Sequence, residues 1–383
     1  MKLNSITDVN ISKKGSAITK GFALLMMFFH HLFYSTERMA EYGFNALIFN
    51  RDVTSQIALD MKVCVAAFAF MSGYGMYKKM ERVEKDLTEG KKRIKWHSKN
   101  CIVTYLKLIK DTVFLILITV PLSIMLGLKK QPSAIWGGEA VGMIKGILLN
   151  MTGLADRFDT AWFISSWWYL DIAIMFILLF PFIYEVFKRR YGRYIIVGLY
   201  ILAVVFIPSV DVIDDSLFRY LPPFLLGMDT ADRDIFEKTE KWIKEADERT
   251  FFLAAGIILC FILSVIVQHK TRIEFIPQCF QAFLIALFSF ALVRRLAVIS
   301  GIMTIVGKHS KYMWLIHVYI YGQLLRGFLF SMKNIWLIFF VLVIISLALS
   351  YVLGKSCDSL SEWGKSLLKK VFGSGENKET EGA

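Results

Sequence analysis

Residues 18–34, ITKGFALLMMFFHHLFY, combine an apolar stretch with one lysine and two histidines. Histidine can exchange a proton near neutral pH, and a lysine ammonium can hold an anion. Lys20 and His31 are 11 positions apart, close to three helical turns, so a helix places both on one face about 16 Å apart. His30 projects about 100° away from that face. The spacing therefore favours Lys20 and His31 as members of one site.

The stretch that carries these residues is one of about ten apolar blocks. The chain has 383 residues, of which 56% are hydrophobic, and its mean hydropathy is +0.51. Residues 112–128 and 335–354 are each about long enough to cross a hydrocarbon core of about 30 Å. We predict an all-α, polytopic integral membrane protein with about ten transmembrane helices. The predicted spans are 18–36, 57–77, 103–128, 162–185, 194–209, 217–231, 250–268, 276–293, 303–325 and 335–354.

The net charge of +13 would suggest a nucleic-acid partner in a soluble protein. In a membrane protein, Lys and Arg collect in cytoplasmic loops, so no nucleic acid is expected. With the N-terminus in the cytoplasm, the inside segments carry 29 Lys and Arg residues and the outside segments carry 11. We therefore predict that both termini are cytoplasmic. Residues 78–99 are expected to form a basic cytoplasmic loop, and residues 232–249 a surface helix.

The chain divides into three parts by composition. Residues 1–15 are polar and form a cytoplasmic segment, and no signal-peptide cleavage site is expected after the first apolar run. Residues 16–355 form the membrane domain, and residues 356–383 form a cytoplasmic tail that is partly disordered. The five cysteines are scattered without a CxxC motif, so neither a disulfide framework nor a metal site is expected.

Five motifs together resemble the membrane-bound acyltransferase type 3 family over about residues 16–355. The first is a cation, ten residues and a histidine, here Lys20 and His31, with Ala23 three after the cation. The others follow in the family's order: FAFMSGYGM (68–76), AWFISSWWYL (161–170), FRYLPPFLLGM (218–228) and GKHSKYMWLIHVYIY (307–321).

The sequence departs from the family pattern at three places. Lys20 replaces the usual Arg, which keeps the charge but loses the bidentate fork. Ala66 occupies a position where many members have an acidic residue. The family's Arg-x-x-Arg motif after the second span has no residue-by-residue match. The nearby cations that could replace it are Lys92, Arg93, Lys95 and Lys99.

The resemblance implies transfer of an acyl group, often acetyl, from coenzyme A to a hydroxyl of a glycan or glycolipid. It implies acyl-CoA as the donor substrate, no tightly bound cofactor, and a place in the cell membrane, with a bacterial origin expected. We expect His31 to be catalytic, as a base or as a transient acyl carrier. The expected substrate-binding residues are Lys20, Ser72, Gly73, Tyr74, Lys92, Arg93, Lys95, Lys99, Trp162, Ser310 and His317.

Other interpretations remain open for these residues and for the whole chain. Ser72 and Gly73 are equally consistent with close helix packing. Ser310, His317 and Tyr321 share a helical face that packing alone could explain. A transporter or flippase of a lipid-linked sugar would also have about ten spans and interior cations, although two related halves are not seen. In a multispan sensor or scaffold, the placement of Lys20 and His31 on one helical face would have no evident function.

Overall fold

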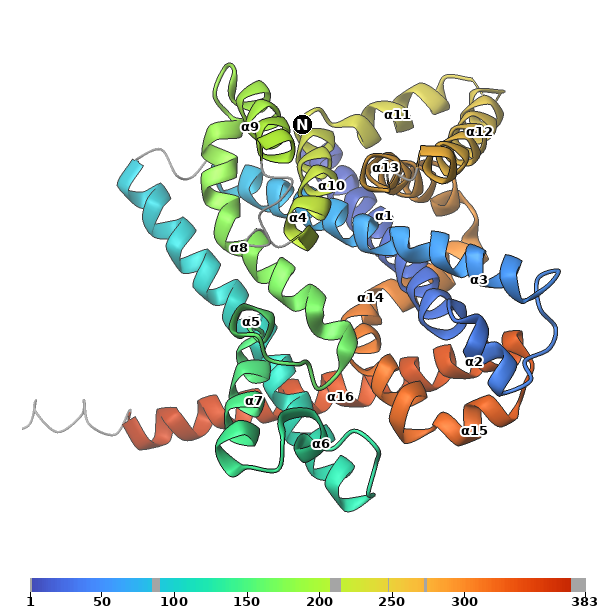
Figure 1. Cartoon of the computed structure of the whole chain (residues 1–383). Helices are drawn as coiled ribbons and strands as arrows, with labels where there is room; N and C mark the ends of the chain where they lie inside the picture. Colours follow the sequence, from blue (N-terminus) through green and yellow to red (C-terminus); the bar gives the residue numbers. More distant parts are fainter. Residues whose placement is uncertain (1, 85–89, 207–214, 247, 272–273, 373–383) are drawn as a thin grey trace, which may run out of the picture.

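The computed structural model describes residues 2–84, 90–206, 215–246, 248–271 and 274–372 (Figure 1). Within these ranges the chain is built from helices, without any strand, which confirms the predicted all-α class. The longer helices are α1 (Lys2–Phe33), α3 (Arg51–Asp60), α4 (Cys64–Glu84), α5 (Gly90–Met125), α7 (Ala140–Thr152), α8 (Trp168–Phe187), α9 (Gly192–Phe206), α10 (Asp215–Asp232), α11 (Ile235–Lys244), α12 (Glu248–Thr271), α13 (Phe275–Ala291), α14 (Ala297–Tyr319) and α16 (Ile335–Phe372). Short helices are α2 (Thr36–Glu41), α6 (Pro132–Trp136), α15 (Arg326–Ser331), the 3-10 turns η1 (Met61–Val63), η2 (Asp156–Phe158), η3 (Ser165–Trp167) and η4 (Val293–Arg295), and the π-helical segment η5 (Ile320–Leu324).

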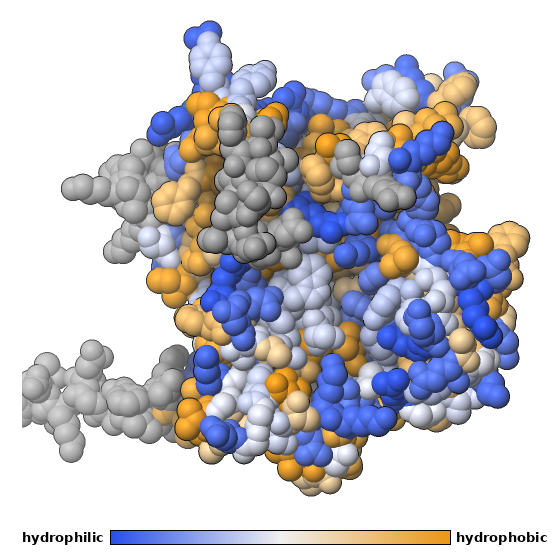
Figure 2. Space-filling view, in the orientation of Figure 1, coloured by the Kyte–Doolittle hydropathy of each residue, from blue (hydrophilic) through white to orange (hydrophobic). Residues whose placement is uncertain are grey.

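Seven helical segments in the described part of the chain are long and apolar enough to cross a membrane. They lie at the predicted first to fourth, seventh, eighth and tenth spans. The other three predicted spans coincide with α9, α10 and α14, which are too short or too polar to meet the same criterion. Hydrophobic side chains cover much of the periphery, while hydrophilic side chains lie across the middle of the face in Figure 2. The seven apolar helical segments make the chain a polytopic membrane protein.

Several predicted boundaries differ from the structure, and two of them show why. The stretch 78–99 was expected to be a loop, but α4 continues to Glu84 and α5 begins at Gly90. The fourth span was expected to begin at residue 162, but α8 begins at Trp168 after η3. Both errors have one cause, because hydropathy marks the apolar part of a helix and does not mark where the helix itself begins or ends.

Helix α1 runs through the middle of the bundle and contacts α4, α13, α14 and α16 (Figure 1). Its contact with α14 depends on two glycines. A Cβ atom at Gly21 would lie 2.4 Å from the Met303 carbonyl oxygen, and one at Gly307 would lie 1.8 Å from the Ala17 carbonyl oxygen. Side chains larger than hydrogen are excluded at both positions. The glycines therefore bring the backbones of α1 and α14 together and fix the faces that carry His31 and Ser310.

A second close contact joins α4 to α10. A Cβ atom at Gly73 would lie 2.0 Å from the Phe224 carbonyl oxygen, and one at Gly227 would lie 2.0 Å from the Phe70 carbonyl oxygen. The contact is reciprocal, with each helix offering one glycine to the other's backbone. Gly73 therefore packs helices, and the structure does not place it in a substrate site.

The predicted surface helix at 232–249 is present as α11. It buries Phe236, whose ring stacks on Phe290 of α13 with centroids 4.0 Å apart. The buried carboxylate of Glu240 pairs with Arg294 at 2.7 Å. An apolar stripe and one ion pair thus hold α11 against the end of α13.

Candidate active site

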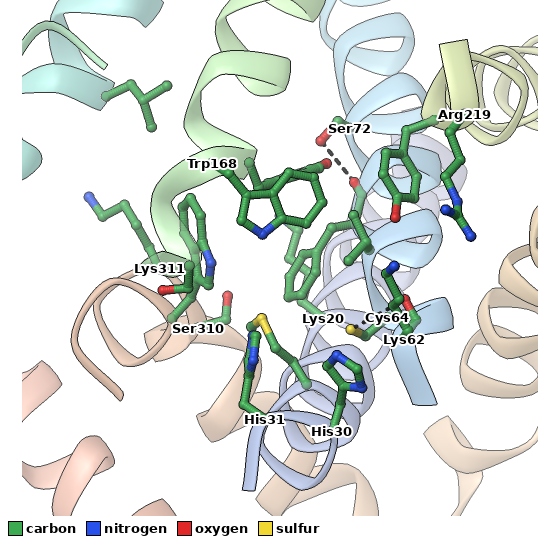
Figure 3. Close-up of a pocket in the computed structure, with 18 residues that line it drawn as sticks. Lys20, His30, His31, Lys62, Cys64, Ser72, Trp168, Arg219, Ser310 and Lys311 are labelled. Atoms are coloured by element: carbon green, nitrogen blue, oxygen red, sulfur yellow. Dashed lines mark hydrogen bonds between the residues drawn. The ribbon is translucent and has the colours of Figure 1, made fainter. Parts of the chain in front are cut away.

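A cavity of about 580 Å³ opens between α1, α4, α5, α8, α10 and α14 (Figure 3). Its lining combines cations, two histidines, three serines and aromatic rings, without any aspartate or glutamate among the described lining residues. The residues that line it are Lys20, Met27, His30, His31, Lys62, Cys64, Val65, Phe68, Ser72, Leu108, Ser166, Trp168, Tyr169, Arg219, Tyr220, Ser310, Lys311 and Trp314. Sequence reasoning placed Lys20 and His31 in one site, and both line this cavity.

His31 has no hydrogen bond to either ring nitrogen among the residues that the structure describes. Its ring centroid lies 5.1 Å from that of His30 and 5.2 Å from that of His317. Helix α1 places it two residues before the helix end at Phe33. An imidazole with unoccupied nitrogens at a cavity wall can accept a proton from a bound hydroxyl.

His30 also lines the cavity but is held differently. Its Nδ1 lies 2.8 Å from the Ala58 carbonyl oxygen, which can only accept, so Nδ1 carries the proton. The helical-face argument separated the two histidines by direction. In the structure both reach the cavity (Figure 3), and their hydrogen bonding is what differs. His30 is tied to the backbone of α3, whereas His31 is not.

Four cations line the cavity, and their partners distinguish them. Lys311 donates to the buried carboxylate of Asp111 at 2.5 Å, and Arg219 forms an ion pair with Glu274. Lys62 also interacts with other groups of the chain. Lys20 has no ion-pair or hydrogen-bond partner among the described residues. An ammonium group without a carboxylate partner is available to bind the negative charge of an incoming substrate.

His317 lies directly behind His31. It is fully buried, its ring stacks on Phe28 with centroids 4.6 Å apart, and its Nδ1 donates to the Trp314 carbonyl oxygen at 2.7 Å. Since Nδ1 holds the proton, Nε2 is an acceptor, and no group in the described residues satisfies it. His317 therefore stands as a second imidazole beside His31 and outside the cavity lining.

The two predicted serines line the cavity, and each already donates its hydroxyl proton to a backbone carbonyl oxygen. Ser72 donates to the Phe68 carbonyl oxygen at 2.9 Å, a bond drawn in Figure 3, and Ser310 donates to the Gly307 carbonyl oxygen at 2.8 Å. Their oxygen lone pairs remain able to accept a hydrogen bond. They can orient a ligand, but neither is arranged as a nucleophile, because no base contacts their oxygens in the described structure.

Several predicted site residues lie elsewhere. Tyr74 is buried against Phe236, and its hydroxyl donates at 3.4 Å to Glu237, a carboxyl whose pKa is raised by burial. Lys99 is exposed on α5 and does not line the cavity. Trp162 lies in the non-helical segment before η3 and is likewise outside the lining. The backbones of Lys92, Arg93 and Lys95 belong to the first turns of α5, and their side chains lie outside the described part.

Other lining residues were not singled out from the sequence. Trp168, Arg219 and Lys311 all fall within motifs that resembled the family, so proximity to a motif was an available signal. Lys62 was detectable as an isolated cation within the second predicted span. Tyr220 lies next to Arg219 in the same motif, two residues before the proline pair of α10, so the same signal applied to it.

Two smaller cavities continue from the main one between α4, α5 and α8. A cavity of about 290 Å³ shares Ser72, Leu108 and Lys311 with the main cavity. A further cavity of about 130 Å³ borders the second one at Met76, Thr104 and Ile177. Its remaining residues include Lys79 of α4 and Trp96 and Asn100 of α5, near the helix ends that are predicted to be cytoplasmic.

The fold and the cavity define a class: an integral membrane protein whose helices enclose cations and an unbonded histidine, suited to handling an anionic substrate and a proton. The comparison with protein families narrows this class. A family model described as an acyltransferase domain matches residues 16–355. The chain therefore belongs to the acyltransferase type 3 family and contains a membrane acyltransferase domain. The searches of curated proteins and of solved structures found no match.

Proposed function

We propose that the protein transfers an acyl group, acetyl in the first instance, from cytoplasmic acyl-CoA to a hydroxyl of a glycan or glycolipid. The observation that carries the proposal is the pairing of an unpartnered Lys20 with an unbonded His31 in one cavity inside the membrane domain. A phosphate-bearing donor needs a cation, and transfer to a hydroxyl needs a base.

The reaction follows from the roles of these groups. The hydroxyl oxygen of the acceptor attacks the thioester carbonyl carbon, and a carbon–oxygen bond forms. His31 takes the hydroxyl proton as general base. The carbon–sulfur bond breaks, and the thiolate of coenzyme A receives the proton from His31. The acceptor leaves as an ester and the donor as free coenzyme A, so no external reductant or oxidant is required.

The positions of the other residues support the same assignment. The ring of His317, stacked on Phe28, lies tilted beside that of His31 with centroids 5.2 Å apart. Lys311 is neutralised by Asp111, which leaves Lys20 as the cation whose charge is open to the donor. The chain of smaller cavities between α4, α5 and α8 offers the elongated donor a path from the predicted cytoplasmic side.

The test uses membranes that contain the full chain and acyl-CoA labelled in its acyl group. We expect label to enter the glycan fraction in wild-type membranes and to be absent with His31→Ala at equal protein level. Label in the glycan that is independent of His31 would contradict the role of this residue. Label that enters neither glycan nor lipid in wild-type membranes would contradict the proposed function.

A further inference from the structure

A second polar cavity lies beyond the His31 end of α1, on the face predicted to be outside. Its volume is about 220 Å³. We infer that this outer cavity binds a phosphate- or carboxylate-bearing group of the acceptor. The inference rests on the proposed function, because it treats the ligand as the acyl acceptor. The residues that carry it are Tyr34, Arg38, Lys130, Tyr321, Gln323 and Arg326.

The charge of the outer cavity is the first reason. Arg38, Lys130 and Arg326 all line it, and its described lining has no aspartate or glutamate. None of the three cations forms an ion pair with a carboxylate in the described part of the chain. Three cations gathered in a small space repel one another, so an anion that enters relieves their repulsion as well as gaining hydrogen bonds.

The second reason is that two of these cations are already oriented. Arg38 Nη1 donates to the carbonyl oxygens of His31 and Leu32 at 2.7 and 3.2 Å, which leaves its other nitrogens available. Arg326 Nε donates to the Tyr42 hydroxyl at 3.0 Å. The two guanidinium groups are therefore held in position before any ligand arrives, which lowers the entropic cost of binding.

The third reason is the shape of the backbone around the cavity. Residues Ile320–Leu324 form a π-helical segment, a rare geometry that is often found at functional sites. It places Tyr321 and Gln323 together in the lining. Gln323 Oε1 accepts from the Lys130 backbone N–H at 3.2 Å, which ties the outer loop to this segment. Hydroxyl and amide groups beside cations suit a ligand that carries both hydroxyls and a negative charge.

The outer cavity is connected to the proposed catalytic group by a few short contacts. Arg38 is bonded to the backbone of His31 itself. The Tyr321 ring lies 6.2 Å from that of His317, which in turn lies 5.2 Å from that of His31. Ser165 lines the outer cavity, and the next residue, Ser166, lines the main one. The two cavities are thus neighbours, and Arg38 of the outer cavity is bonded directly to the residue proposed as the base.

Binding is tested first without any donor, so that the result does not depend on catalysis. The full chain is placed in phosphatidylcholine nanodiscs, and its Tm is followed against inorganic phosphate, glucuronate and neutral glucose at constant ionic strength. We expect phosphate or glucuronate to raise the Tm and glucose to leave it unchanged. Lys130→Glu should reduce the rise, whereas Lys129→Glu, the adjacent lysine outside the cavity, should retain it in full. An equal rise in both variants would overturn the inference.

A second arm separates an acceptor anion from a lipid headgroup. The titration is repeated in nanodiscs that contain phosphatidylglycerol. We expect the phosphate-dependent rise in Tm to persist, because the acceptor site is not saturated by a bilayer lipid. Its loss in phosphatidylglycerol would identify a lipid headgroup as the occupant and would overturn the acceptor assignment.

A third arm compares two acceptors in the same membranes. Transfer of label to glycan should fall about tenfold or more in Lys130→Glu, as expected for the loss of a charged hydrogen bond. Slow hydrolysis of acyl-CoA, in which water is the acceptor, should stay at the wild-type rate. Equal losses in both reactions would contradict an acceptor role. Absence of both reactions in wild-type membranes would contradict the proposed function, while the nanodisc titration would still decide the outer site.

Discussion

At the scale of single residues, the difference between His30 and His31 is their hydrogen bonding. His30 is fixed to the Ala58 carbonyl oxygen, and His31 has no such partner among the described residues. His31→Ala should lower transfer by about 10²- to 10⁴-fold, the usual contribution of a general base. His30→Ala should keep most of the activity and lower stability by about 1 kcal/mol, the typical worth of one hydrogen bond.

The measurement is acyl transfer per unit of membrane-inserted protein, together with the Tm of each variant. Equal losses of transfer in both variants would show that the two histidines act together. A His30 variant with unchanged Tm would show that its bond to Ala58 contributes nothing to stability.

Lys20 should act on donor binding more than on the chemical step. Lys20→Gln should raise the KM for acyl-CoA with kcat less affected, since a charged hydrogen bond contributes about 1.5–3 kcal/mol. Lys20→Arg should keep activity because charge and reach survive. Lys14→Gln is the matched control, because Lys14 is exposed on the same helix and does not line the cavity. A donor KM that is unchanged in Lys20→Gln would assign Lys20 to helix anchoring at the headgroups.

At the scale of helices, the contact between α1 and α14 makes a sharp prediction. Gly307→Ala should destabilise the protein by about 1–3 kcal/mol, because a methyl group would overlap the Ala17 carbonyl oxygen. Gly301→Ala, on the same helix, meets open space and should be neutral or slightly stabilising. The test compares the Tm of the two variants in the same detergent. A Gly307 variant as stable as Gly301→Ala would mean that the two helices are not packed this closely.

Lys20 and His31 line the same cavity, as their spacing indicated, because both belong to one continuous helix. Lys20 and His31 share a face over three turns, and α1 is unbroken through both. Trp162 was placed at the start of the predicted fourth span, but residues 160–164 are not helical and Trp162 lies outside the cavity lining. Gly73 was ambiguous because a small residue serves equally for packing and for a cavity wall. Only the position of Phe224, about 150 residues away, resolves it.

Cavities were the hardest feature to predict. The main cavity is lined by six different long helices, and the pairing of Lys311 with Asp111 joins residues 200 positions apart. Hydropathy identifies spans but carries no information about which helices become neighbours. The sequence motifs nevertheless marked the correct segments, since Trp168, Arg219 and Lys311 all come from them.

At the scale of the whole molecule, the orientation in the membrane remains a prediction from the distribution of Lys and Arg. Single cysteines at Ser133 and Ser98, both exposed, are introduced into a chain without its native cysteines. An impermeant thiol reagent should label the first in intact cells and the second only after the cells are opened. The reverse pattern would invert the topology, and would also place the outer cavity in the cytoplasm.

The glycine contacts between α1 and α14 also decide how the enzyme can move. Because the backbones of α1 and α14 are in direct contact, we expect these two helices, which carry His31 and His317, to move together as one rigid body. Entry and exit of the proposed donor would then depend on movement of α4, α5 and α8, which border the smaller cavities. A covalent staple between α1 and α14 should therefore leave turnover intact, whereas a staple that closes α4 onto α5 should trap the donor or exclude it. His31, the proposed catalytic histidine, therefore lies on the rigid α1–α14 side of the cavity, and the proposed path of the donor lies on the side formed by α4, α5 and α8.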